Sequence, residues 1–172
     1  MTGSEDDDDS ENSVETGTGS FTVSGDLEAE YEGAAYYTVM RLDGELVSVR
    51  IHIAKAHPSD RDDSYSSTYS FLLMTDRDGE PINVSPGTYQ VEQPTEDELT
   101  FAAYFTKREG DDVTGYHTRD HGGTLTISSS SDQMIEATFE FTLQDDDHPS
   151  NVEGGLITIS GEINAECFGI NC

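Results

Sequence analysis

Hydrophobic and polar side chains alternate with a period of two along most of the chain after residue 20. Successive side chains of an extended strand point to opposite faces, so this alternation predicts half-buried β-strands. The apolar positions of one parity are Phe21, Val23, Leu27 and Ala29; Val47, Val49, Ile51 and Ile53; Phe101, Ala103 and Phe105; Leu125 and Ile127; Ile135, Ala137, Phe139, Phe141 and Leu143; and Ile157, Ile159 and Ile163. Further strands are expected within residues 34–41, 65–75 and 88–92. No window shows the 3.6-residue period of a helix.

Turn-forming residues separate these segments, among them Asp43-Gly44, Pro86-Gly87 and Gly122-Gly123. Eight or nine short strands with one apolar face each predict an all-β chain, folded as a single antiparallel β-sandwich or flattened barrel. We place this domain at residues 20–172, which is long enough to bury a substantial core. Residues 1–19 are rich in acidic residues and poor in apolar ones, so we expect a disordered tether.

The chain is strongly acidic, with 36 acidic and 8 basic residues and a formal net charge of -28. Nucleic acids and anionic membrane surfaces are improbable partners, because both require clustered Lys and Arg. No apolar run is long enough to cross a bilayer. The tether holds seven of the acids, so the folded part keeps most of the charge and repels itself. Salt at about 1 M shortens the Debye length to about 3 Å, so we predict a surface adapted to concentrated salt. A protein that loads divalent cations and an ordinary acidic domain are the alternatives.

The second half of the chain has a recognisable order of strands and turns. It is carried by Pro86-Gly87-Thr88-Tyr89, by residues 123–128 and 135–142, and by residues 155–165. These segments resemble a group of uncharacterised bacterial lipoproteins and secreted proteins. The resemblance implies a small β-sandwich outside the cytoplasmic membrane, with no assigned activity and no catalytic residues to carry over. The chain departs from that pattern at Ala137, where the group usually has Gly, and in its acidity.

The acidic, Ser- and Gly-rich N-terminus is similar to the spacer that follows the lipid-bearing cysteine of lipoproteins. The sequence has neither that cysteine nor a signal peptide, and Met1 would then stand in place of a removed leader. We therefore expect an extracytoplasmic protein, periplasmic, outer-membrane-anchored or secreted, whose precursor carries a lipid anchor or signal. The alternative is a native Met1 and a cytoplasmic protein of a salt-accumulating cell.

Cys167 and Cys172 lie at the end of the chain, five residues apart. A disulfide between them would fix the segment after the last strand, as is typical of an oxidising compartment. Free thiols and a metal site are the alternatives.

Clustered carboxylates are the best candidates for a binding site. Asp76 and Asp78 belong to a D-x-D-G sequence that has the start of a calcium loop but lacks the final Glu of an EF-hand. Asp145, Asp146 and Asp147 form a second cluster in another loop. Carboxylate oxygens suit Ca²⁺, so Ca²⁺ is the one cofactor we consider, against a chain that otherwise has none.

No pattern of catalytic residues stands out. His117 and His121 have a spacing that converges only on a helix, whereas their segment is a strand followed by a turn, so we expect a solvated loop. The chain contains no G-x-S-x-G nucleophile motif and no Trp to line a sugar-binding cleft.

These observations favour a non-enzymatic, extracytoplasmic β-sandwich protein, with a role in binding or surface structure and a surface adapted to high salt. Two alternatives remain. One is a calcium-dependent binding or adhesion module that uses the Asp-rich loops. The other is a subunit of a surface filament that assembles with other surface proteins through strand edges.

Overall fold

The computed structural model describes residues 17–55, 69–75, 81–93, 98–109, 111–147, 155–169 and 172. Its ten strands are β1 (Thr18–Gly25), β2 (Ala29–Leu42), β3 (Glu45–Ala54), β4 (Tyr69–Met74), β5 (Gly87–Val91), β6 (Ala102–Glu109), β7 (Asp112–His117), β8 (Gly123–Ser130), β9 (Met134–Asp145) and β10 (Leu156–Cys167). No helix occurs within the described residues, so the predicted all-β class is confirmed.

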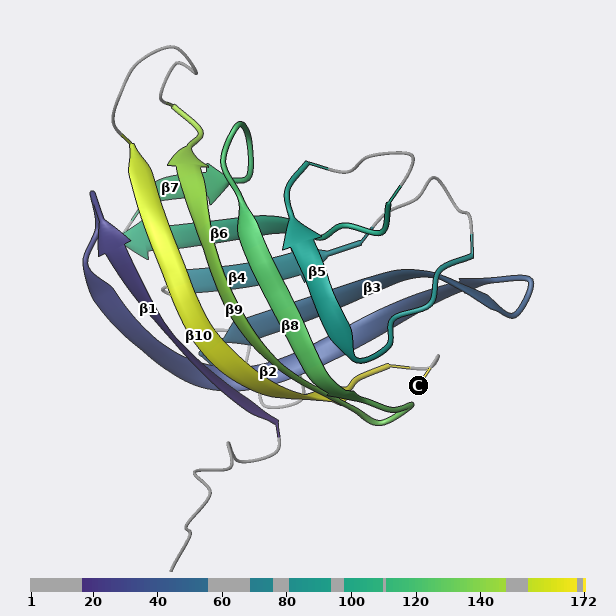
Figure 1. The fold of residues 1–172 in the computed structure, drawn as a ribbon. Helices are drawn as coiled ribbons and strands as arrows, with labels where there is room; N and C mark the ends of the chain where they lie inside the picture. Colours follow the sequence, from purple (N-terminus) through teal and green to yellow (C-terminus); the bar gives the residue numbers. More distant parts are fainter. Residues whose placement is uncertain are drawn as a thin grey trace, which may run out of the picture.

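The strands form two layers that lie face to face (Figure 1). The front layer has the order β1-β10-β9-β8-β5, and the back layer has the order β2-β3-β4-β6-β7. β1 also pairs with β2, and β7 also pairs with β9, so eight antiparallel strands close into a ring from which β8 and β5 extend. The predicted sandwich or flattened barrel is therefore confirmed.

The front and back layers are joined at two places, and the two contacts differ greatly in length. β1 pairs with β2 from Thr18 to Val23, which makes a continuous corner. β7 meets β9 only at Tyr116 with Asp145 and at His117 with Gln144, because β8 occupies the rest of that edge of β9. The front and back layers consequently separate along β8 and β5. This opening, opposite the β1–β2 corner, is called the open edge below.

Residues 81–86 run along the open edge and connect the layers. The Ile82 N–H donates to the Leu46 carbonyl of β3 at 2.7 Å. The Ser130 hydroxyl at the end of β8 donates to the Val84 carbonyl at 3.1 Å. Ile82 and Val84 are half-buried against the core. The segment therefore narrows the opening without adding a strand to either layer.

The core consists of the side chains at the alternate positions that were predicted to face inward, and aromatic rings fill its centre. Phe71 of β4 is fully buried, with its ring centroid 5.2 Å from those of Phe21 and Phe139 and 5.8 Å from that of Phe141. Rings from β1, β4 and β9 thus meet between the layers. Gly161 of β10 leaves room for Phe21 on the neighbouring strand β1, because a Cβ there would lie 2.2 Å from the Ser20 carbonyl oxygen and 2.6 Å from the Phe21 Cβ.

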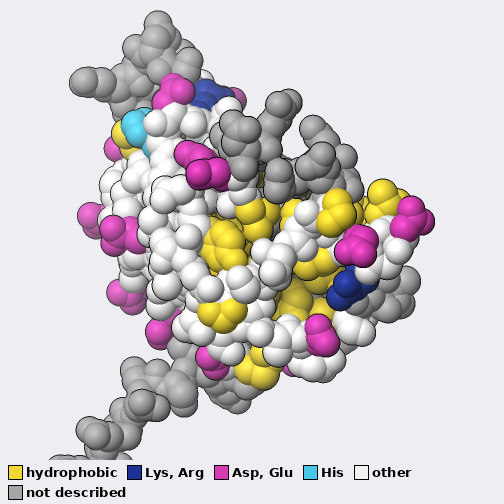
Figure 2. All heavy atoms as spheres, turned by 45° about the vertical axis from the view of Figure 1, so that its right-hand side comes forward, with side chains coloured by type: hydrophobic (Ala, Val, Ile, Leu, Met, Phe, Trp, Pro, Cys, Tyr) yellow, Lys and Arg dark blue, Asp and Glu magenta, His cyan; other side chains and the backbone are white. Residues whose placement is uncertain are grey.

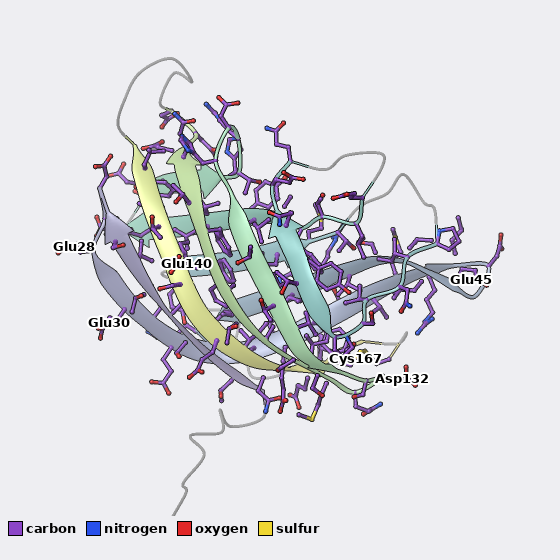
Figure 3. All side chains as sticks on the ribbon, in the orientation of Figure 1. Glu28, Glu30, Glu45, Asp132, Glu140 and Cys167 are labelled. Carbon is purple, nitrogen blue, oxygen red and sulfur yellow. A yellow bond between two sulfur atoms is a disulfide. The ribbon has the colours of Figure 1, made fainter. Side chains whose placement is uncertain are left out.

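The outer face of the front layer and the adjoining part of β2 carry carboxylates and hydroxyls side by side. One row across the strands is Glu32, Ser20, Glu162 and Thr138, and the next is Glu30, Thr22, Ser160 and Glu140. Each carboxylate in these rows therefore lies opposite a hydroxyl and not opposite another charge, which avoids the most destabilising pairing. Figure 3 shows Glu30 and Glu140 directed away from the strands. The strands of this layer contain no Lys or Arg.

Three features of the strands differ from the prediction. Residues 21–29 do not form one strand, because Gly25 has a φ of 110° and turns the chain between β1 and β2. β7 was not predicted as a separate strand, since only Tyr116 among its residues is buried and the alternation is weak. β1 begins at Thr18, two residues before the expected domain start, where it pairs with Asn164 and Ala34. Residues 1–16 lie outside the described residues.

The packing of Phe71 gives a test of this core. We expect Phe71→Ala to lower the free energy of unfolding by about 3–5 kcal/mol, because it removes a fully buried ring and leaves a cavity. Denaturant titration of purified protein in concentrated salt measures this change. Met40→Ala is the control, since Met40 is 52% exposed, and it should change stability by less than about 0.5 kcal/mol. Equal effects of the two substitutions would contradict the packing.

Candidate ligand-binding site

A hollow opens to solvent between the two layers at the open edge. We call it the edge hollow, and its volume is about 570 Å³. Figure 2 turns this side of the molecule forward and shows hydrophobic side chains exposed in a depression between polar surfaces. Residues from both layers, from the 81–86 segment and from the end of the chain surround it. It exists because β8 displaces β7 from β9, which leaves the inner face of the β2–β3 hairpin only partly covered at Val39 and Leu46.

Aliphatic side chains form the floor of the edge hollow. Val39 and Val49 come from β2 and β3, where they are directly opposite each other, and Leu46 lies nearer the β2–β3 turn. Ile135 of β9 and Val84 complete the floor from the other side. Val49 and Ile135 belong to the buried core, whereas Val39, Leu46 and Val84 are only partly buried. The floor is therefore an exposed continuation of the core.

Most hydroxyls around the edge hollow are bound to the protein itself. The Tyr37 hydroxyl donates to the Ser131 carbonyl at 2.9 Å, and the Ser130 hydroxyl donates to the Val84 carbonyl. The Ser131 hydroxyl accepts from the Met134 N–H at 3.1 Å. The Tyr37 bond holds the turn between β8 and β9 against β2, the Ser130 bond holds it to the 81–86 segment, and the Ser131 bond lies within the turn. The hydroxyls thus shape the hollow and are not positioned as nucleophiles.

Burial changes the acidity of Tyr37 at this site. Desolvation raises the pKa of the Tyr37 phenol above its ordinary value of 10.0, and the negative charge of Asp132 raises it further. Both effects disfavour the phenolate. Tyr37 therefore remains a neutral hydrogen-bond donor well into the alkaline range.

The disulfide closes one side of the edge hollow. Cys167 and Cys172 are joined, with their Cα atoms 5.7 Å apart, and both residues line the hollow. The Cys167 N–H donates to the Gln133 carbonyl at 2.8 Å, and the Phe168 N–H donates to the Tyr37 carbonyl at 2.8 Å. Figure 3 shows Cys167 and Asp132 at the same end of the molecule. The end of the chain is therefore attached to the rim.

The acidic loops do not gather around the edge hollow. Asp145 accepts a bond from the Asp147 N–H at 2.8 Å, and the Asp146 carboxylate pairs with His117. These three aspartates form a hydrogen-bonded turn after β9. Among the described residues, no group of three or more His, Cys, Asp or Glu is arranged to hold a metal ion. Asp76 and Asp78 lie outside the described residues, so their calcium site stays a prediction.

His117 has neighbours that the sequence did not reveal. It ends β7 instead of lying in a solvated loop, and its Nδ1 is bonded to Asp146, 29 residues away in the chain. The Arg119 Nε–H donates to His117 Nε2 at 2.9 Å, and a second Arg119 N–H donates to the Asp146 carbonyl at 3.1 Å. Both ring nitrogens are therefore occupied. In this arrangement the imidazole has no lone pair with which to take a proton from a substrate.

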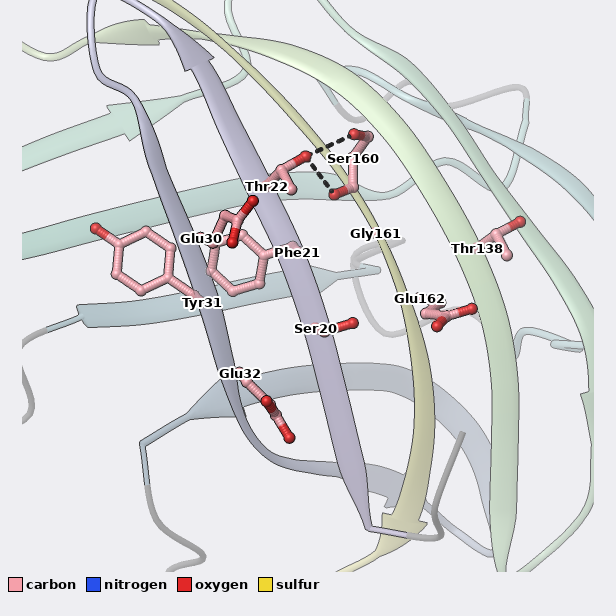
Figure 4. Close-up of a pocket in the computed structure, with 10 residues that line it drawn as sticks. All are labelled: Ser20, Phe21, Thr22, Glu30, Tyr31, Glu32, Thr138, Ser160, Gly161 and Glu162. Carbon is pink, nitrogen blue, oxygen red and sulfur yellow. Dashed lines mark hydrogen bonds between the residues drawn. The ribbon is translucent and has the colours of Figure 1, made fainter. Parts of the chain in front are cut away.

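A larger hollow, of about 640 Å³, lies on the outside of the β1–β2–β10 corner (Figure 4). Glu30, Glu32 and Glu162 surround it together with hydroxyl side chains, and the Thr22 and Ser160 hydroxyls are 3.1 Å apart. Tyr31 and the buried Phe21 also line this hollow, beside Gly161, which has no side chain. We assign the site to the edge hollow instead, because its aliphatic floor is an exposed continuation of the core.

Comparison of the chain with protein-family models, with curated proteins and with solved structures found no match. Within the described residues, no helix is long and apolar enough to span a membrane.

Tyr37 gives a pH-dependent test of the rim. Its pKa is raised by folding, so the neutral phenol stabilises the fold fully below about pH 10, and this contribution is lost as the pH rises through the higher pKa of the folded state. We expect stability to fall between about pH 9 and about pH 11, and to fall less in Tyr37→Phe. Urea unfolding at the two pH values, with tyrosinate absorbance as a second signal, measures the difference. Tyr104→Phe is the control, because Tyr104 is exposed outside the hollow. Equal pH dependence in both variants would show that the burial of Tyr37 is not the cause.

Proposed function

We propose that the chain is a non-enzymatic binding protein that acts outside the cytoplasmic membrane and holds a small apolar ligand in the edge hollow. The observation that carries this proposal is the floor of Val39, Leu46, Val49, Val84 and Ile135, which continues the core but opens to solvent. Exposed apolar area of this kind costs free energy unless something covers it. A ligand that covers the floor recovers that free energy.

The size and shape of the edge hollow support this role. Small-molecule sites are typically concave, apolar and about 300–1,000 Å³ in volume, with a few polar groups around them. The edge hollow is concave, has a volume in this range and has an aliphatic floor, and polar side chains such as Asn83, Ser131 and Gln133 also line it. Its walls are fixed by the backbone bond from Ile82 to Leu46, by the Tyr37 hydroxyl and by the disulfide. The site is therefore largely formed before the ligand arrives.

The hydrogen bonds around the hollow favour binding over catalysis. A nucleophile needs a base within hydrogen-bond reach, and an acid–base residue needs a nitrogen or oxygen that faces the substrate. The hydroxyls of Tyr37 and Ser130 donate to backbone carbonyls, and His117 is occupied at both nitrogens. The hydrogen bonds of these groups stabilise the fold.

Two features support the proposed environment. The disulfide is of the kind that persists in oxidising compartments, which agrees with export. The front layer carries Glu140 and Glu162 without a single Lys or Arg in its strands, and Glu30 of β2 lies in the same row as Glu140, which agrees with a surface that salt must screen.

Assembly into a filament through strand edges receives less support. β5 has only five residues, from Gly87 to Val91. Its outer edge is partly occupied, because the Phe101 N–H donates to the Gln90 carbonyl and the Glu92 N–H donates to the Phe101 carbonyl, each at 2.9 Å. A partner strand would find little edge to extend.

Binding at the edge hollow is tested with N-phenyl-1-naphthylamine, a neutral apolar probe that becomes fluorescent in apolar surroundings. We expect saturable binding to the intact chain in concentrated salt. Leu46→Glu should weaken it by about tenfold or more, because a carboxylate on the floor must be desolvated by the probe.

Leu42→Glu is the matched control. It makes the same substitution in the same hairpin, but Leu42 is 57% exposed and does not line the hollow. Probe binding that is lost equally in both variants, or in neither, would contradict a site at the edge hollow.

Adaptation to salt is tested by thermal unfolding in KCl. Raising KCl from about 0.1 M to about 1 M shortens the Debye length from about 10 Å to about 3 Å. We expect the midpoint to rise by about 2–4 °C for every kcal/mol of repulsion that is screened. A variant with Glu30→Gln, Glu140→Gln and Glu162→Gln should be more stable at low salt and less sensitive to KCl.

Two outcomes would contradict this explanation. The first is a midpoint that does not change with KCl. The second is a larger rise in CaCl2 than in KCl at matched ionic strength, which would favour the calcium-dependent module instead.

A further inference from the structure

We propose that the ligand of the edge hollow is an amphipathic carboxylate, whose apolar chain lies on the aliphatic floor and whose head group binds Arg41. This inference rests on the proposed function, because it names the chemical class of the ligand for the same hollow. It depends on three properties of Arg41, namely its position, its lack of an ion-pair partner among the described residues and the geometry of its guanidinium group.

The position of Arg41 places a cation where the pattern requires an apolar side chain. Ala35, Tyr37 and Val39 alternate along the inner face of β2, and Arg41 is the next residue of that series. β2 and β3 change register between Met40 and Arg41, after which Arg41 is directly opposite Leu46. Opposite residues of an antiparallel pair share a face of the sheet. Arg41 therefore lies beside an aliphatic residue of the floor, and it lines the hollow.

Arg41 makes no ion pair within the part of the chain that the structure describes. Two other cations there are engaged. The Lys107 ammonium lies 2.8 Å from the Glu109 carboxylate, and Arg119 is bonded to His117 and to the Asp146 carbonyl. Arg50 and Arg108 also make no ion pair among the described residues, so Arg41 differs from them by its place in the lining of the hollow. No described carboxylate competes with a ligand for the Arg41 donors.

The guanidinium group suits a carboxylate better than other head groups. Its planar arrangement of N–H donors matches the two oxygens of a carboxylate, and the paired bonds are stronger than those between neutral groups. The stem of Arg41 can lie along Leu46 while its head stays at the mouth. A ligand with one apolar chain and one carboxylate satisfies the floor and the arginine together.

The net charge of -28 opposes this ligand only at long range. Repulsion between an approaching anion and the distant surface carboxylates is screened when the Debye length is about 3 Å, at about 1 M salt. A contact between Arg41 and a carboxylate at the edge of an apolar hollow is screened much less. Asp132, the other charged residue of the lining, is exposed in the β8–β9 turn and would favour a cationic head group instead. A cationic amphiphile is therefore the alternative that the experiment must distinguish.

The experiment compares three competitors that share a ten-carbon chain and differ in head-group charge. Decanoate, decan-1-ol and decyltrimethylammonium are each titrated against N-phenyl-1-naphthylamine bound to the intact chain. The titrations are made at about 1 M KCl and about pH 8, where a carboxylic acid is ionised. We expect decanoate to compete best. In Arg41→Gln its apparent affinity should fall about tenfold, while that of decan-1-ol stays the same. Arg41→Lys should recover part of the loss.

Arg50→Gln is the matched control, because Arg50 is an exposed residue of β3 that does not line the hollow. It should leave all three competitors unchanged. The inference alone is overturned if the probe binds and Leu46→Glu weakens it, but decanoate binds equally to the intact chain and to Arg41→Gln. It is also overturned if decyltrimethylammonium competes best. Failure of the probe to bind, or binding that Leu46→Glu does not weaken, overturns the edge hollow as a site and this inference with it.

Discussion

A β-strand has two hydrogen-bonding edges, and β9 divides one of its edges between two partners. β10 occupies the other edge from Leu156 to Glu166. On the divided edge, β8 pairs along most of the strand and β7 reaches only Gln144 and Asp145. The branch in the sheet follows directly from this division. The two layers stay closed at the β1–β2 corner and separate at the open edge, and the position of the edge hollow depends on that separation.

The alternation of the sequence predicts the inner faces of this fold well, because side-chain direction in a strand is a local property. Ile51 and Leu143 face the core as their parity requires. The edge hollow could not be predicted in this way, since it depends on which strands pair. The alternation also did not predict β7 as a separate strand, because β7 buries few side chains. One signal of the site was present in the sequence. Arg41 is two residues after Val39, on the parity of the inner face, where a charged residue interrupts an apolar series.

The acidic residues and the edge hollow do different work. The carboxylates of the front layer project into solvent, opposite hydroxyls of neighbouring strands, and none of the described Asp or Glu side chains is buried. They determine the conditions in which the fold is stable. The floor of the edge hollow is aliphatic, and Arg41 and Asp132 are the charged residues of its lining. The acidic composition therefore indicates the solvent conditions that the fold requires. The site is indicated instead by a residue that interrupts the apolar pattern, namely Arg41.

The contact between β7 and β9 also bears on how the molecule moves. Local opening costs less where few backbone hydrogen bonds must break. β9 is held by β10 along nearly its whole length, but its bonds to β7 lie at its last residues, Gln144 and Asp145. We therefore expect the ring to open locally at the contact between β7 and β9, with the β1–β2 corner as the hinge. Such a motion widens the gap between the layers while the disulfide remains intact, so entry of a bulky molecule between them would not require any strand to unfold.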